Sequence, residues 1–160
     1  LRVSNCRVLA MDLRGHGSTR TDDDTRLDMD TLSADAAAVY SACLEPAAGG
    51  ATVVLGGHSV GGAVAAWACG RSRAAGLALV DVAEAAAHAS FEHMAALLRA
   101  RPACFPSPAH AVKWAVAAQL PRSVASARVS VPPQLQALAD GWHWRTDVLA
   151  ARAHWAGWYH

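Results

Sequence analysis

Five consecutive residues in the first half of the chain, Gly57-His58-Ser59-Val60-Gly61, combine a nucleophile with small neighbours that can expose it. Glycines two positions before and after Ser59 permit a strained turn, because larger side chains would clash there. Such a turn lifts the hydroxyl above the backbone and places the N–H of Val60 at a helix start, where it can stabilise an oxyanion. The pentapeptide therefore predicts acyl-transfer chemistry, with Ser59 as the nucleophile and Val60 in the oxyanion hole.

The segments on either side of this pentapeptide are those that the turn requires. The run 51–55 is apolar and β-branched, which predicts a buried strand, and the small residues 63–69 predict a helix that Gly70 ends. A G-x-S-x-G pattern is weak by itself, since small-residue sequences match it by chance. A strand before the pattern and a helix after it make it specific.

A serine nucleophile also needs a base to take its proton and an acid to orient that base. Asp81 directly follows a predicted strand at 76–80, so we expect it at the same carboxyl edge of the sheet as Ser59. The residues alone leave two roles for Asp81, the triad acid or the N-cap of the next helix. Asp12 ends another apolar run and is expected to hold the turn that follows it, and Glu84 is expected in the first turn of a helix.

No histidine of the chain is assigned as the base. The usual chain order is serine, acid, histidine. His58 adjoins the nucleophile, but neighbouring residues on such a turn point in different directions. The second oxyanion donor is expected in a loop before residue 1, since the chain starts within the lead-in to a strand. The histidines after the acid all fall in segments predicted to be helices or loops: His88, His93, His110, His143, His154 and His160.

The first half of the chain alternates between two kinds of pattern. Short apolar runs at 7–11, 51–55 and 76–80 predict strands, and alanine-rich or small-residue stretches at 31–44 and 63–69 predict helices. For the first of these helices, a threonine or a serine at its start is the expected N-cap. Strands that alternate with helices indicate a parallel sheet with crossover helices.

From Glu84 onward the sequence predicts only helices and loops. The predicted helices cover 85–99, 108–120 and 146–155, and the segment 129–133 is expected to be extended or a loop. The fold class is therefore α/β, with a mostly parallel sheet followed by a helical lid. Together with the serine turn, this order of elements resembles a partial α/β-hydrolase fold.

These elements predict a single incomplete domain over residues 1–160. The sheet core with the nucleophile turn covers 1–83, and the helical lid region covers 84–160.

Composition narrows the classes of function. The chain has 14 Lys and Arg against 13 Asp and Glu, a formal net charge of +1, which implies no basic face for nucleic acid. No apolar run reaches the length that spans a membrane. The cysteines are scattered without a C-x-x-C pair, which predicts free thiols in a reducing compartment and no metal or cofactor. They are Cys6, Cys43, Cys69 and Cys104.

Beyond the serine turn and the segment 12–17, which are general features of α/β hydrolases, the second half carries a more specific series of segments. In chain order they are 80–84 (VDVAE), 97–102 (LLRARP) with Phe105 and Ser107, 111–116 (AVKWAV), 126–130 (SARVS) with Gln134, 144–147 (WRTD) and 155–159 (WAGWY). In this order and spacing, across nearly its whole length, the chain resembles the protein phosphatase methylesterase family.

The resemblance implies a serine carboxylesterase that removes the methyl ester from the C-terminal leucine of the protein phosphatase 2A catalytic subunit. It implies a protein of the cytoplasm or the nucleus that uses no cofactor, with Ser59 as nucleophile and Asp81 as triad acid. The family's catalytic histidine lies beyond a further strand, so it would follow residue 160. The chain is therefore expected to be a fragment that is inactive by itself.

Two alternatives stay open beside the protein methylesterase. The first is an esterase for small molecules that uses the same Ser59 chemistry, and the second is a non-catalytic remnant that only binds a phosphatase. The segments 99–105 and 126–130 favour the methylesterase, since a generic lid would not reproduce them.

Overall fold

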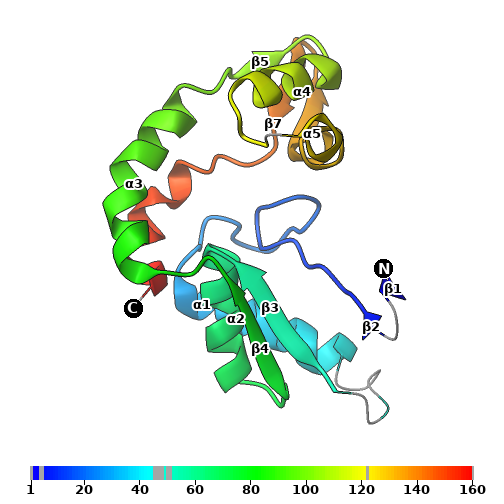
Figure 1. Cartoon of the computed structure of the whole chain (residues 1–160), viewed down its shortest axis with the longest axis vertical. Coiled ribbons are helices and arrows are strands. Elements are labelled where there is room, and N and C mark those ends of the chain that lie inside the picture. Colours follow the sequence, from blue (N-terminus) through cyan, green and yellow to red (C-terminus); the bar gives the residue numbers. More distant parts are fainter. Residues whose placement is uncertain (1, 4–5, 45–48, 50–51, 122, 160) are drawn as a thin grey trace.

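The computed structural model describes all residues except 1, 4–5, 45–48, 50–51, 122 and 160. Figure 1 shows two lobes that the long helix α3 (Glu84–Arg99) joins. We call the described residues of 12–99 and 150–159 the serine lobe, and the described residues of 104–144 the hairpin lobe. Among the helices of the described chain, none is long and apolar enough to cross a membrane.

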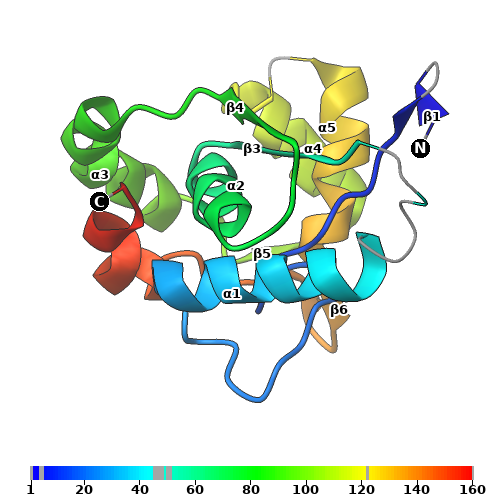
Figure 2. The same cartoon turned by 90° about the horizontal axis from the view of Figure 1, so that it is seen from below.

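The serine lobe is built on two parallel strands. β3 (Val54–His58) pairs with β4 (Gly76–Val80) in a register that runs from Val54↔Gly76 to His58↔Val80. The helix α2 (Val60–Gly70) packs on both strands, and α1 (Met29–Val39) packs on α2, an arrangement that Figure 2 shows from below. A strand, a turn and a helix therefore follow one another directly around residue 59.

One apolar core holds this lobe together. Leu32 of α1 and Val64 of α2 are buried with Ala95 of α3 and with Trp155 of the 3-10 helix η3 (Ala150–Tyr159). In Figure 1, η3 lies alongside α3, and the ring centroids of Phe91 and Trp155 are 5.7 Å apart. The end of the chain thus returns to the lobe that contains the serine.

The hairpin lobe has its own core and a small antiparallel sheet. Its strands are β5 (Cys104–Phe105), β6 (Leu135–Leu138) and β7 (Gly141–Trp144), in the order β5-β7-β6. The helix α4 (Pro108–Ala117) contacts β5, and α4 packs with the helix α5 (Val124–Ser130) and the 3-10 turn η2 (Pro132–Gln134). The buried residues of this core are Phe105, Ala111, Ala115, Ala127, Val131 and Leu135.

The prediction that only helices and loops follow Glu84 is wrong for these three strands. They are two to four residues long, and β5 pairs with a strand about 40 positions later, as in Cys104↔His143. Such short runs give no alternating pattern that a sequence window can detect. The segment 129–133 is also not extended, since it ends α5 and enters η2. The last helix begins at Ala150 rather than 146 and is a 3-10 helix.

In the first half, the strand predicted at 76–80 is confirmed and the other two differ. The strand predicted at 51–55 lies at 54–58, because its pairing with β4 continues through the glycines to His58; residue 51 lies outside the described part. The segment 8–11 forms no ladder, and only β2 (Cys6–Arg7) pairs there, with β1 (Arg2–Val3). Residues 8–11 therefore belong to no strand of the described chain.

The first helix also starts earlier than the sequence predicts. Its N-cap is Asp28, whose carboxylate accepts the N–H of Thr31 at 2.9 Å. The helix then continues into a π-helical turn, η1 (Tyr40–Leu44). An aspartate at the N-cap accepts an N–H of the first turn just as a threonine would. The sequence alone therefore did not distinguish Asp28 from a later threonine as the cap.

Candidate active site

Ser59 lies on a strained turn between β3 and α2. Its backbone has φ 52° and ψ −126°, a combination that residues with a side chain rarely adopt. The N–H of Ser59 donates to the carbonyl of Val80 at 3.0 Å, which extends the β3–β4 ladder up to the serine itself. The strand thus fixes the residue before the turn, and the helix fixes the residue after it.

Two glycines near Ser59 are needed for the turn, Gly57 and Gly62, and Gly62 lies outside the G-x-S-x-G motif. A Cβ on Gly57 would overlap the carbonyl of Gly61, and a Cβ on Gly62 would lie 2.9 Å from the carbonyl oxygen of Gly57. A Cβ on Gly61 would meet nothing within 4 Å. Glycine is therefore required where Gly57 approaches the backbone of residues 61–62. On the helix side of this contact, Gly62 is the residue that cannot carry a Cβ.

The residue predicted as oxyanion donor, Val60, lies at the start of α2. Val60 is the first residue of α2, and the carbonyl of Ser59 accepts the N–H groups of Gly62 and Ala63 at 2.9 and 3.2 Å. The first N–H groups of a helix have no acceptor within the helix, and the helix dipole favours negative charge there. The geometry suits the role predicted for the Val60 N–H.

Asp81 lies at the same edge of the sheet as Ser59. Because His58 pairs with Val80, the residues that follow them, Ser59 and Asp81, leave neighbouring parallel strands side by side. Asp81 has φ 52°, and its side chain is 85% exposed. The N-cap of α3 is Ala83, so the alternative role of Asp81 as a helix cap is wrong.

His58, the residue before Ser59, lies near Asp81. His58 Nε2 lies 3.9 Å from Asp81 Oδ2, and both side chains are largely exposed. A contact of this length between exposed groups contributes little.

The hydroxyl of Ser59 has an unexpected partner from the other end of the chain. Its Oγ lies 3.1 Å from the hydroxyl oxygen of Tyr159, the last residue of η3. The Tyr159 ring also faces Phe91 of α3, with centroids 6.4 Å apart. Sequence reasoning missed this residue, because the two hydroxyls are 100 positions apart and no motif links them.

No described histidine takes the place of Tyr159 as partner of the Ser59 hydroxyl. His160, one of the histidines considered in the sequence, lies outside the described residues.

The two other carboxylates singled out in the sequence have the expected structural places. Asp12 accepts the N–H of Ser18 at 3.3 Å, and its carbonyl accepts the Thr19 hydroxyl at 2.9 Å, so it holds the turn. Glu84 lies in the first turn of α3.

Residue types that bind metals come together away from the serine. In the described part of the chain, Cys104, Asp140 and His143 of the hairpin lobe place one ligand atom each within 4.8 Å of one another. A pocket of about 290 Å³ adjoins them, with His143, Trp144 and Arg101 among its lining residues. The guanidinium of Arg101 stacks on the Trp144 ring at 3.5 Å, and burial lowers its pKa.

The whole chain matches the model of the alpha/beta hydrolase family, over residues 1–160, and the chain belongs to this family. It is also similar to solved structures of an esterase from Mycobacterium tuberculosis. One of these has a TM-score of 0.63 and 31% identity over 86% of this chain and 46% of the esterase chain. Another has the same TM-score and 27% identity over 88% and 49%.

Curated relatives carry the name of the family that the second half of the sequence resembles. A probable protein phosphatase methylesterase 1 from Caenorhabditis elegans is 33% identical over 97% of this chain and 43% of its own length. Protein phosphatase methylesterase 1 from Yarrowia lipolytica is 34% identical over 95% and 38%, and that from Mus musculus is 36% identical over 82% and 34%. The chain thus spans less than half the length of these relatives, and its resemblance to the methylesterases is confirmed.

Proposed function

We propose that the full-length protein is a serine carboxylesterase that demethylates the C-terminal leucine of a protein phosphatase 2A catalytic subunit. The observation that carries the proposal is the strained turn at Ser59, with Val60 at the helix start and Asp81 on the adjacent strand end. The segments shared with the methylesterases supply the substrate class. Free cysteines among the described residues fit a reducing compartment, the cytoplasm or the nucleus.

The chemistry follows from these groups. The Ser59 oxygen attacks the carbonyl carbon of the ester, and a histidine base takes the hydroxyl proton. The carbonyl oxygen becomes an oxyanion that the Val60 N–H stabilises. The protonated base gives its proton to the departing methoxide, which leaves as methanol. Water then hydrolyses the acyl-enzyme and releases the free carboxylate of the substrate, while Ser59 regains its proton.

The hairpin lobe and α3 are proposed to act as the lid over this site. The family-like segments 97–102, 111–116 and 126–130 lie in this part of the chain. A lid with its own core, as in the cluster around Phe105 and Leu135, can hold a protein tail in a fixed orientation over the serine.

The test uses the full-length protein and a methylated phosphatase 2A catalytic subunit as substrate. We expect demethylation by the wild type, covalent labelling of Ser59 by a fluorophosphonate probe, and loss of both in Ser59→Ala. Ser41→Ala, at an exposed serine of η1 outside the proposed lid, serves as the matched control and should keep both. Equal labelling of Ser59→Ala and the wild type contradicts the assignment of the nucleophile.

An esterase for small molecules is the second candidate, favoured by the likeness to the mycobacterial esterase. Comparison of kcat/KM for the methylated phosphatase with that for p-nitrophenyl acetate separates the two. A preference for the small ester, with Ser59 labelled, retains the nucleophile and rejects the protein substrate. Phosphatase binding without Ser59-dependent turnover would instead support the non-catalytic alternative.

A further inference from the structure

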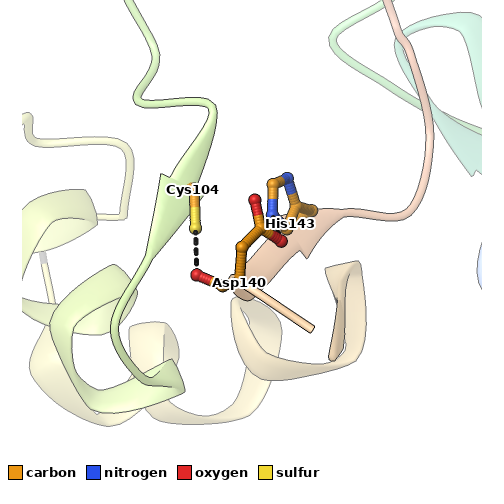
Figure 3. Close-up of side chains that lie close together, drawn as sticks. All are labelled: Cys104, Asp140 and His143. Atoms are coloured by element: carbon orange, nitrogen blue, oxygen red, sulfur yellow. Dashed lines mark hydrogen bonds and ion pairs between the residues drawn. The ribbon is translucent and has the colours of Figure 1, made fainter. Parts of the chain in front are cut away.

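The hairpin lobe brings a thiol, a carboxylate and an imidazole together on one face of its sheet. Cys104 of β5 is the register partner of His143 of β7, so their side chains lie on the same side. Asp140 belongs to the two-residue turn between β6 and β7, and its Oδ1 lies 2.8 Å from His143 Nε2. Figure 3 shows the three side chains converging from these three places.

The backbone next to the Cys104 thiol leaves room for its sulfur atom. Gly141 has φ 144°, and a Cβ at this position would lie 2.5 Å from Cys104 Sγ and 2.9 Å from the carbonyl oxygen of Phe105. Only glycine leaves room for the sulfur so close to the turn. The thiol makes only weak contacts there, to the carbonyl oxygens of Asp140 at 3.6 Å and of Phe105 at 3.8 Å.

The scaffold around these ligands is ordered by packing. Phe105, the neighbour of the cysteine, is buried, and so is Leu135 at the start of β6. Trp144 follows the histidine, and its indole N–H donates to the carbonyl of Pro102 at 2.8 Å. The three side chains are thus presented by a fixed hairpin rather than by a loose loop.

We propose that Cys104, Asp140 and His143 bind a zinc-type divalent ion that fastens β5 to the β6–β7 hairpin. One sulfur, one nitrogen and one carboxylate oxygen form a donor set for zinc or cobalt, whereas magnesium and calcium prefer oxygen alone. Bonds of about 2.0–2.3 Å place the donors of a tetrahedral ion about 3.5 Å apart. The ligand atoms here all lie within 4.8 Å of one another, so small side-chain rotations are sufficient.

Access and charge suit an ion that enters from solvent. The side chain of Asp140 is 73% exposed and that of His143 is 23% exposed, which leaves a fourth position open to water. The carboxylate of Asp140 accepts the hydrogen bond from His143 and supplies the negative charge of the site. The ion would replace the Asp140–His143 contact and cross-link positions that are 36 residues apart in the chain.

The experiment adds Co²⁺ to the full-length protein after treatment with a chelator, because cobalt bound to a thiolate gives a ligand-to-metal charge-transfer band in the near ultraviolet. We expect this band in the wild type and in Cys69→Ser, a matched control with a free thiol in α2. We expect no band in Cys104→Ser. Loss of an outer-sphere partner costs about 10–100-fold in metal affinity, so Asp140→Asn and His143→Gln should cost at least that.

Thermal unfolding in the presence of Zn²⁺ tests the same site by a second measurement. Zn²⁺ should raise the melting temperature of the wild type and leave that of Cys104→Ser unchanged, while all variants melt alike in EDTA if they fold. A band that persists in Cys104→Ser, that disappears in Cys69→Ser, or that never forms in the wild type would overturn the site. Neither the cobalt band nor the melting temperature depends on esterase activity.

Discussion

At the scale of single residues, the backbone of Ser59 holds the candidate site under strain. A residue at φ 52° and ψ −126° costs about 1–3 kcal/mol, and such residues persist only where the surroundings over-determine them. Here the Val80 carbonyl binds the serine N–H and the helix takes over within one residue. Asp81, on the neighbouring strand end, also has a positive φ. A strained residue that its surroundings hold in place is typical of functional sites, which agrees with the role proposed for Ser59.

We predict that Asp81→Asn in the full-length protein loses about four orders of magnitude in kcat while its melting temperature stays unchanged. Asparagine tolerates the left-handed backbone as aspartate does, and Asp81 caps no helix, so the fold loses nothing. Steady-state kinetics and thermal unfolding check this. Wild-type activity in Asp81→Asn would remove this residue from the triad.

We expect the hydroxyl of Tyr159 to restrain Ser59, the proposed nucleophile, in the ground state. A phenol is the better donor of the two hydroxyls, so we expect it to donate to Ser59 Oγ, 3.1 Å away. This bond weakens when the serine oxygen attacks, and an interaction stronger in the ground state than in the transition state slows the reaction.

Tyr159→Phe should therefore raise the rate of fluorophosphonate labelling by about fivefold, the equivalent of a hydrogen bond of about 1 kcal/mol. The substitution keeps the ring against Phe91. Tyr40→Phe, at a buried tyrosine in η1, is the matched control and should leave the rate unchanged. Slower or equal labelling of a folded Tyr159→Phe would contradict this restraint.

At the scale of elements, the turn from β3 to α2 depends on one glycine contact more than on the motif as a whole. Gly57→Ala should destabilise the full-length protein by about 1–3 kcal/mol, because its Cβ overlaps the Gly61 carbonyl. Gly61→Ala has open space and should be neutral or gain about 0.5–1 kcal/mol, since glycine is a poor helix residue. Denaturant unfolding with labelling of Ser59 checks both. Equal losses in the two variants would mean that the turn is not packed in this way.

Elements with strong local signals could be predicted from the sequence. The run 76–80 and the small residues before Gly70 place β4 and α2, and the pentapeptide at the start of α2 places Ser59. The place of Asp81 beside Ser59 follows from the end of β4, because parallel strands end at one edge. The role of Asp81 as acid stays a prediction, although its competing role as a cap is excluded.

Features that depend on distant pairing could not be predicted. β5 and β7 pair over about 40 residues, and each is too short to show a period. The contact of Tyr159 with Ser59 depends on the return of η3 to the serine lobe, which no local pattern encodes. Scattered cysteines gave no sign of a ligand cluster, since the spacing from Cys104 to Asp140 and His143 matches no zinc motif.

At the scale of the whole molecule, the sheet of the serine lobe exposes apolar side chains on both faces. The exposed fractions are 40% for Leu77, 49% for Leu79, 59% for Val80 and 56% for Val54. Parallel strands in α/β proteins are normally covered on both faces, and unpaired strand edges invite association with other chains.

We therefore predict that residues 1–160, expressed alone, bind the dye ANS strongly and associate as the protein concentration rises. Leu77→Lys with Leu79→Lys should reduce both effects, because alternate residues of β4 lie on one face of the sheet and two charges there oppose association. Met94→Lys, at a 45% exposed residue of α3, is the control for added charge and should change neither. Light scattering and ANS fluorescence check this. If Met94→Lys relieves association as well as the double variant does, net charge and not the face of β4 controls it.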